Sequence, residues 1–117
     1  MTLLTKDQIL AVDDRSTKEV DVPEWGGSCL LGCMTAAERD SFEASMLDAK
    51  GQAKKLQNFR ARFIAHCIVD SDGNRLFSDK DVMALGKKSS APISRLFDEA
   101  RKLNGMTDED VEELEGN

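Results

Sequence analysis

The hydrophobic and polar positions follow the period of a helix along most of the chain. The strongest pattern lies in residues 53–69, where apolar side chains recur every three or four positions and predict the longest amphipathic helix. This stripe consists of Leu56, Phe59, Phe63, Ile64, Cys67 and Ile68. A second stripe predicts a helix over 91–104, which Gly105 ends because glycine readily takes the left-handed conformation after a helix. Shorter helices are predicted over 6–13, 36–48, 79–86 and 108–115.

Four of these helices begin with a capping pattern. A Thr or Ser followed three residues later by Gln, Glu or Asp can satisfy the free backbone N–H groups at a helix start. The four pairs are Thr5 with Gln8, Thr35 with Glu38, Ser78 with Asp81, and Thr107 with Asp110. Asp is the weaker partner in the last two pairs, because its side chain is shorter than those of Glu and Gln. The pattern therefore predicts where four helices start.

Residues 18–34 follow a different period. Glu19-Val20-Asp21-Val22 alternates polar and apolar side chains, which predicts a half-buried strand, and Trp25-Gly26-Gly27 can form a turn. Ser28 to Met34 then returns as a second strand, and the hairpin must pack on the helices because an isolated hairpin is seldom stable. The predicted fold class is α+β, predominantly α, with about five or six helices and one N-terminal β-hairpin at about 18–34.

The length of 117 residues predicts a single domain over 1–117. We divide it into an N-terminal helix and hairpin (1–34), a helical body (35–104) and an acidic C-terminal helix (107–117). Hydrophobic residues make up 40% and charged residues 32% of the chain, so a packed core is expected and a disordered chain is excluded.

The charge pattern bears on the partners. The net charge of −6 argues against a nucleic-acid binder. Residues 107–117 alone carry −6, and residues 49–69 carry +5 with no acid. The two segments are either solvated faces or attract each other within one chain or between copies, so a weak homo-oligomer is expected.

No apolar run approaches the roughly 20 residues of a membrane span, and no signal peptide is visible. Three cysteines, an odd count, argue against a disulfide framework and favour a reducing cytoplasm.

The residues that could bind a metal do not form a convincing site. Cys29, Cys33, His66 and Cys67 could in principle bind zinc, but the two ends of a C-x3-C pair on a strand lie about 13 Å apart. Small buried cysteines are the simpler interpretation. The run from Asp70 to Asp81 has its glycine at the wrong position for a calcium-binding EF-hand loop. It is better read as a tight turn.

Binding to another protein is the function class that remains. His66 has no nucleophile partner by motif, and the chain lacks the phosphate-loop, G-x-S-x-G and H-E-x-x-H motifs, so we predict neither an enzyme nor a cofactor. The terminal helix has a thin apolar edge on an acidic body, and the hairpin exposes strand edges. The residues predicted to contact a partner are Trp25, Val111, Leu114, Lys54, Lys55, Arg60 and Arg62.

The order of the segments resembles the tail assembly chaperones of long-tailed, siphovirus-type bacteriophages. The matching stretches are TKDQILAVDD (5–14), EVDVPEWGG (19–27), MTAAERDSFE (34–43), DSDGNRLFSDKDVMALGKKS (70–89) and LNGMTDEDVEELEGN (103–117). None of them is a catalytic motif, so their specificity lies in their order and in the length of the chain. The segment SCLLGC (28–33) departs from the more alternating, polar strand of the family.

The resemblance implies a non-enzymatic chaperone that binds the tape measure protein and keeps it soluble while the tail tube forms around it. It also implies self-association, and a longer product, made by ribosomal frameshifting, that engages the tail tube protein. The expected location is the cytoplasm of the infected bacterium, and the protein should be absent from the mature virion. The alternative is a structural tail or head–tail morphogenesis subunit that stays in the virion. Such subunits usually need more β structure than one hairpin.

Overall fold

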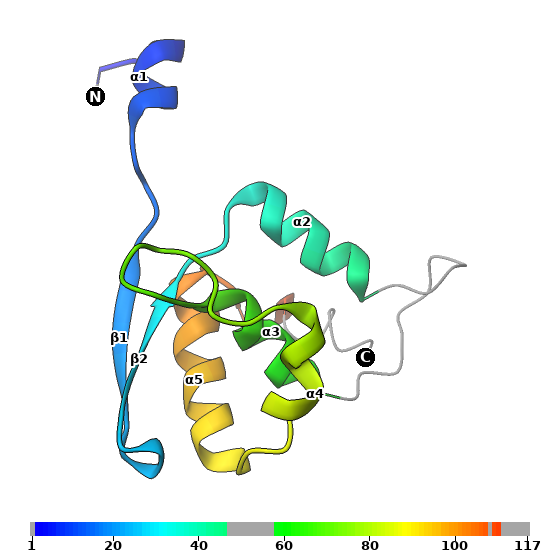
Figure 1. Ribbon diagram of the computed structural model, residues 1–117. Helices are drawn as coiled ribbons and strands as arrows, with labels where there is room; N and C mark the ends of the chain where they lie inside the picture. The colour runs from blue at the N-terminus through cyan, green and yellow to red at the C-terminus, as the bar shows by residue number, and fades with distance from the viewer. Residues whose placement is uncertain (1, 47–57, 108, 111–117) are drawn as a thin grey trace.

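The computed structural model describes residues 2–46, 58–107 and 109–110, and Figure 1 shows their arrangement. The predicted fold class, α+β and mainly α, is confirmed. Along the chain the elements are α1 (Lys6–Ala11), β1 (Thr17–Val22), the 3-10 turn η1 (Pro23–Trp25), β2 (Gly27–Gly32), α2 (Ala36–Ser45), α3 (Phe59–Cys67), β3 (Ile68–Val69), η2 (Asp79–Asp81), α4 (Val82–Leu85) and α5 (Ser90–Leu103).

The sheet is antiparallel in the order β1-β2-β3, so the predicted hairpin is present but has a third strand. The prediction was wrong for Ile68 and Val69, which it assigned to the end of a helix. The helix ends at Cys67, and the next two residues pair with Leu31 and Leu30 of β2. Both residues are buried and β-branched. An apolar stripe can therefore run from a helix into a buried strand without a break in its period, and the sequence pattern does not reveal the change.

The turn of the hairpin begins earlier than the glycine pair. Pro23–Trp25 forms the 3-10 turn, and Gly26 follows it with φ of +76°, a conformation that glycine adopts without strain. The guanidinium of Arg95 on α5 donates two hydrogen bonds of 2.7 Å to the carboxylate of Glu24. These bonds hold the pKa of Glu24 down, to about 2. The hairpin is thus attached to α5 at its turn, and Lys18 pairs with Glu99 of α5 nearer its open end.

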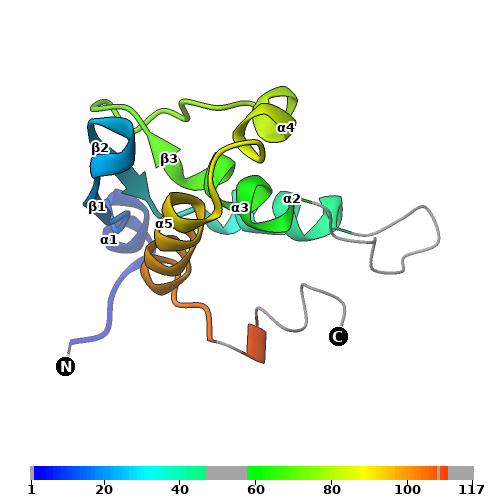
Figure 2. The same ribbon diagram turned by 90° about the horizontal axis from the view of Figure 1, so that it is seen from below.

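The core lies between the sheet and the helices, with α3 in its middle. Figure 2 shows α5 beside α3, and α5 also packs on the hairpin. Phe63 is fully buried and its ring meets those of Phe42 at 5.3 Å and Phe97 at 5.4 Å, both edge to face. Edge-to-face pairs are a favoured arrangement of aromatic rings. Four of the six aromatic residues, Phe42, Phe59, Phe63 and Phe97, therefore lie together where α2, α3 and α5 meet.

Hydrogen bonds form within all four predicted capping pairs, and Thr5 and Thr35 form complete capping boxes with Gln8 and Glu38 at the starts of α1 and α2. At the start of η2 the bonding is one-sided, because the Asp81 carboxylate accepts from the backbone N–H and the hydroxyl of Ser78. Thr107 and Asp110 exchange reciprocal bonds of 3.0 and 3.1 Å. The shorter Asp side chain is sufficient in two of the four cases. These local contacts form both in α2, which packs on the core through Phe42, and in α1, which has no buried residue.

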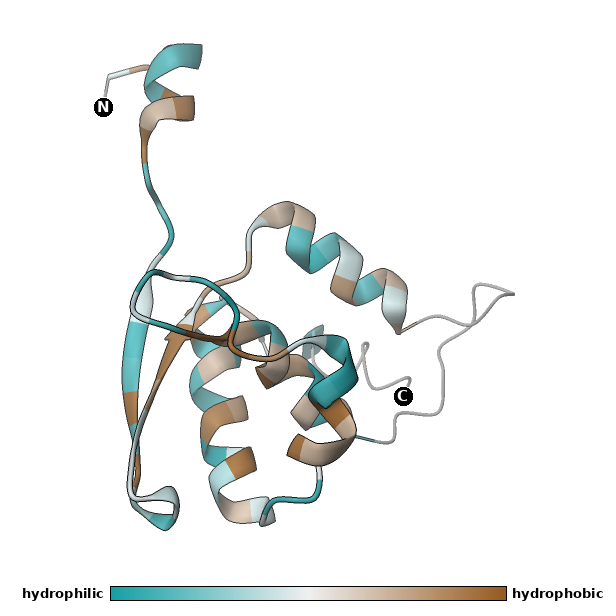
Figure 3. Cartoon of the chain, viewed as in Figure 1, coloured by the Kyte–Doolittle hydropathy of each residue, from teal (hydrophilic) through white to brown (hydrophobic). Residues whose placement is uncertain are grey.

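Helix α1 is set apart from the rest of the molecule. Figure 1 shows it above the body, joined to β1 by an extended segment. None of its residues is buried, and it ends at Ala11 rather than at the predicted residue 13. Figure 3 shows an apolar turn of α1 next to the connecting segment, where no other element covers it. We call residues 2–12 the N-terminal arm.

Candidate partner-binding surfaces

The N-terminal arm carries most of the large apolar side chains that the described residues expose. Eight such side chains are exposed, and five of them belong to the arm. They are Leu3 (93% exposed), Leu4 (63%), Ile9 (57%), Leu10 (72%) and Val12 (58%). Single exposed apolar residues are ordinary, whereas a cluster of them marks an interaction site. The arm is therefore the first candidate surface for a partner.

The arm is also too short to be stable as an isolated helix. Helix α1 has six residues, and isolated helices shorter than about 12–15 residues are marginal in water. The capping box of Thr5 and Gln8 favours its first turn but buries no apolar surface. A contact with a partner would supply the packing that α1 lacks among the described residues.

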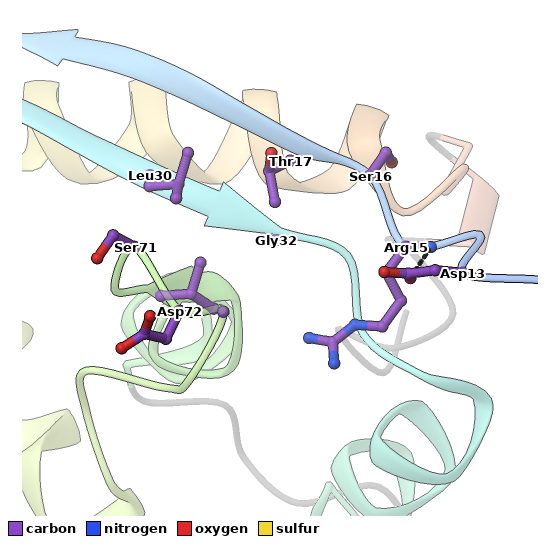
Figure 4. Close-up of a pocket in the computed structure, with 10 residues that line it drawn as sticks. Asp13, Arg15, Ser16, Thr17, Leu30, Gly32, Ser71 and Asp72 are labelled. Atoms are coloured by element: carbon purple, nitrogen blue, oxygen red, sulfur yellow. Dashed lines mark hydrogen bonds between the residues drawn. The ribbon is translucent and has the colours of Figure 1, made fainter.

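A groove lies at the base of the arm, on the face of the sheet opposite α5. It has a volume of about 280 Å³. Leu30, Gly32 and Val69 line its apolar part, and Asp13, Arg15 and Asp72 are among its polar residues. The others are Ser16, Thr17, Ser71 and Gly73. These residues come from three stretches of the chain: the segment that leads into β1 with Thr17, strand β2, and the end of β3 with the loop that follows it (Figure 4).

The strand register explains why this groove exists. Val20 of β1 and Leu31 of β2 point toward α5 and are buried, so the residues that alternate with them along each strand point to the other face of the sheet. Leu30 lies on that outer face, opposite Val69 of β3. Among the described elements no helix covers this face, and the loop over residues 70–74 forms one wall of the groove (Figure 4).

That loop is a tight turn, in agreement with the sequence analysis. The backbone N–H groups of Asp72 and Asn74 donate to the Asp70 carboxylate at 2.9 and 3.0 Å, and Gly73 has φ of +87°. This is the hydrogen bonding of an Asx turn. The Asp70 carboxylate accepts backbone N–H groups, and its role in the loop is structural.

The predicted partner-contact residues do not gather at one place. Trp25 lies in the hairpin turn with 37% of its surface exposed. Arg60 is exposed on α3 and its guanidinium stands 5.7 Å from the ring centre of Phe97, while Arg62 is half-buried on the same helix. Lys54, Lys55, Val111 and Leu114 lie outside the described residues. The contact role of all seven stays a prediction.

His66 and Arg75 form a polar cluster on another side of α3. His66 Nε2 lies 3.5 Å from the Asp79 carboxylate, and Arg75 lies 3.3 Å from it. Burial and the charge of Arg75 nevertheless lower the pKa of His66, because they outweigh the attraction of Asp79 and Glu38. The imidazole ring also packs edge to face on Phe42 at 5.2 Å. His66 is thus a packed, neutral histidine at neutral pH.

The cysteines behave as small buried or half-buried side chains. Cys67 is fully buried, and burial raises the pKa of its thiol to about 12. Cys29 packs against the core, and Cys33 Sγ accepts a hydrogen bond from the backbone N–H of Ser16. Within residues 2–46, 58–107 and 109–110, no group of three His, Cys, Asp or Glu side chains is placed to hold a metal ion.

The exposed surface of the N-terminal arm was not predicted from the sequence. Its apolar residues lie in pairs and flank a capping box, so they gave the signal of a helix that packs on the core. The number of apolar residues in so short a segment could have indicated the surface, because five of the eleven arm positions are large and apolar.

None of the described helices is long and apolar enough to cross a bilayer.

The chain matches a known protein family over most of its length. A family model described as phage tail assembly chaperone matches residues 6–117, nearly the whole chain. The chain belongs to the phage tail assembly chaperone family. Members of this family are non-catalytic morphogenesis proteins, which agrees with the surfaces described above.

One solved structure supports the same fold. The structure of the tail assembly chaperone of bacteriophage HK97 superposes with a TM-score of 0.56 at 20% sequence identity. The match covers 76% of this chain and 85% of the HK97 chain. At this identity the likeness concerns the fold alone. A comparison with curated proteins gives no match.

Proposed function

We propose that this chaperone binds the tape measure protein and keeps it soluble while the tail tube is built. The observation that carries the proposal is the family match over residues 6–117. We further propose that it acts in the cytoplasm of the infected bacterium and does not remain in the virion. A longer, frameshifted product would connect it to the tail tube protein.

The described surface supports a binding role of this kind. A tape measure protein is expected to be a long helical rod with exposed apolar stripes, which aggregate unless they are covered. Outside the arm, the body exposes the apolar side chains of Trp25, Leu76 (57% exposed) and Met83 (69% exposed) among charged neighbours. Such a mixed surface can cover an apolar stripe while its charges keep the complex in solution.

Co-expression tests the proposal. The full chain is expressed together with the cognate tape measure protein, and the soluble fraction and a pull-down of the complex are measured. We expect the soluble fraction to rise several-fold over expression of the tape measure protein alone. The matched control is an unrelated small acidic protein, which tests for a general effect of co-expression. Unchanged solubility together with no recovered complex would refute the proposal.

The virion itself separates the proposal from its alternative. Mass spectrometry of purified particles should find no copies of the chaperone, or only traces of it. Abundant copies at a fixed ratio to the tail tube protein would instead favour a structural subunit that stays in the particle.

A further inference from the structure

A small polar pocket between α2 and α3 holds hydrogen-bonding groups that have no partner among the described residues. It has a volume of about 280 Å³, and its lining residues are Ala37, Glu38, Ser41, His66 and Arg75. We propose that this pocket binds the side-chain carboxamide of a glutamine or asparagine of a partner protein. The proposed function names that partner as the tape measure protein, and the inference rests on the proposed function to that extent.

Packing of the core brings two sides of the pocket together. Glu38 and Ser41 lie on α2, about 60° apart at about 100° per residue, and Phe42 beside them is buried in the core. His66 lies in the last turn of α3, and its ring packs edge to face on Phe42 at 5.2 Å. The pocket is therefore formed before any ligand arrives.

Arg75 forms a third side of the pocket, from the stretch after β3. Its Nε donates to the carbonyl of Ala65 at 3.2 Å, and its Nη2 donates to the Asp79 carboxylate at 3.3 Å. These two bonds fix the guanidinium, whose Nη1 makes no hydrogen bond with a described residue. A guanidinium carries five N–H donors, so donors remain for a ligand.

His66 gives the strongest indication of a ligand. Its side chain keeps only 10% of its surface exposed, yet neither ring nitrogen makes a hydrogen bond with a described residue. The 3.5 Å between Nε2 and the Asp79 carboxylate is longer than an N–H···O bond of about 2.7–3.2 Å. The ring nitrogens are not sealed in the interior, because no enclosed side-chain nitrogen or oxygen of the described residues lacks a partner. A ligand that bonds to the imidazole would remove the cost of burying it unpaired.

The charges around the pocket favour a neutral ligand. Two guanidinium groups, of Arg62 and Arg75, and two carboxylates, of Glu38 and Asp79, act on His66. His66 is itself neutral at neutral pH. A charged ligand would meet like and opposite charges together, so it would gain little net attraction.

A carboxamide matches the hydrogen-bonding groups of the pocket. Its oxygen would accept from the guanidinium of Arg75 or the hydroxyl of Ser41, and its NH₂ group would donate to Glu38 or to the unprotonated nitrogen of His66. One Glu38 oxygen already accepts the backbone N–H of Thr35 at 3.0 Å, which leaves the other oxygen for a ligand. Glutamine and asparagine are the side chains that combine two N–H donors and a carbonyl acceptor in one neutral group.

The size of the pocket points to a side chain of a protein. Its volume of about 280 Å³ lies below the roughly 300–1,000 Å³ of small-molecule sites. A free amide would make few contacts there and bind weakly, whereas a protein partner adds the rest of its interface.

A direct titration tests the ligand class without the tape measure protein. The full chain, isotope-labelled, is titrated with N-acetylglutamine methylamide and followed by NMR. We expect saturable shifts confined to α2, the end of α3 and the residues around Arg75. The charged probe N-acetylglutamate methylamide has the same shape and should bind at least about fivefold more weakly. Equal binding of the two probes, or no saturable shift, would overturn the proposal, because water alone would then satisfy the pocket.

Two variants of α2 test the location of the site. Ala37→Leu fills the pocket without removing a polar group and should abolish binding of the glutamine probe. Ser41→Ala removes one hydroxyl and should weaken binding about two- to tenfold. The matched control is Ala44→Leu, the same substitution at another exposed position of α2 outside the pocket, and it should leave binding unchanged. Probe binding that survives Ala37→Leu, in a protein with unchanged thermal unfolding, would overturn this location.

The tape measure protein is tested separately. Ala37→Leu should weaken its complex with the chaperone several-fold, and Ala44→Leu should not. An unchanged affinity in Ala37→Leu would overturn the tape measure protein as the source of the carboxamide. A chain that binds the probe but forms no complex with the tape measure protein refutes the proposed function and leaves the carboxamide pocket standing. A chain that forms the complex but does not bind the probe refutes the pocket and leaves the proposed function standing.

Discussion

Helix α3 and helix α1 show how differently two short apolar helices of one chain can be stabilised. Six of the nine residues of α3 are buried, whereas none of the six residues of α1 is. The capping of the two helices would predict the opposite, namely that α1 is the more stable one. Helix α1 begins with a complete capping box, whereas Asn58, the residue before α3, has φ of 63° and forms no side-chain cap. Packing, and not capping, therefore decides which helix holds the fold together.

The largest expected effect comes from the centre of α3. Phe63→Ala should lower the free energy of unfolding by about 3–5 kcal/mol, because a fully buried ring is removed and a cavity remains. Ile9→Ala on α1 should change it by less than about 0.5 kcal/mol, since that side chain is already exposed. Urea unfolding of both variants at a concentration where the chain is monomeric measures the difference. Similar losses in the two variants would show that the arm packs on its own body.

The next effect concerns a polar contact that joins the end of α5 to the start of α2. The Asn104 side chain accepts from the backbone N–H of Met34 and donates to the carbonyl of Ala100, both at 2.8 Å. Asn104→Ala should cost about 1–3 kcal/mol, because the half-buried partners lose their hydrogen bonds. Asn74→Ala is the control, since the hydrogen bonds recorded for Asn74 are made by its backbone. Equal unfolding midpoints for the two variants would contradict this role.

The two capping boxes give the most direct test of the comparison. Thr35→Ala removes the cap of α2, which packs on the core through Phe42, and should cost about 1 kcal/mol. Thr5→Ala removes the same motif from α1 and should leave global unfolding unchanged, although hydrogen exchange in the arm should become faster. A loss of global stability in both variants would mean that α1 is coupled to the body.

The smallest effect is a dependence on pH near neutrality that comes from His66 of α3. Burial lowers the pKa of His66 in the folded chain below its ordinary value of 6.5. The unfolded chain therefore takes up a proton first as the pH falls, so stability is fully present above about 6.5 and decreases below it. His66→Gln should flatten the stability profile between pH 7 and 5. A profile that remains as steep in the variant would assign the dependence to other groups.

The fold could be predicted from the sequence in the parts where local chemistry is sufficient. The capping pairs at Thr5, Thr35, Ser78 and Thr107 form as expected, because each needs only residues three positions apart. The alternation at 19–22 correctly predicts strand β1. The end of α3 could not be predicted, because Ile68 and Val69 suit a buried helix and a buried strand equally well and their pairing with β2 decides between them.

The candidate surfaces were much harder to predict. Trp25 and the two arginines of α3 were selected for their residue type, and the structure places them apart. The groove needs three segments that are distant in sequence, and no local pattern brings Asp13, Leu30 and Asp72 together. The arm was not predicted as a surface because an apolar pattern indicates that a helix face is buried, but it does not identify what buries it.

The sequence by itself determined the helix starts, the hairpin, the apolar stripe of α3 and the family to which the chain belongs. These features depend on neighbouring residues or on the order of segments. The tertiary structure alone decided that Ile68 and Val69 join the sheet, that the face of Leu30 stays open, and that the arm stays exposed among the described residues. The physical reason is that burial is a property of the whole arrangement: a Leu in α1 and a Leu in α5 have the same local chemistry, and only the surrounding chain determines which one water reaches.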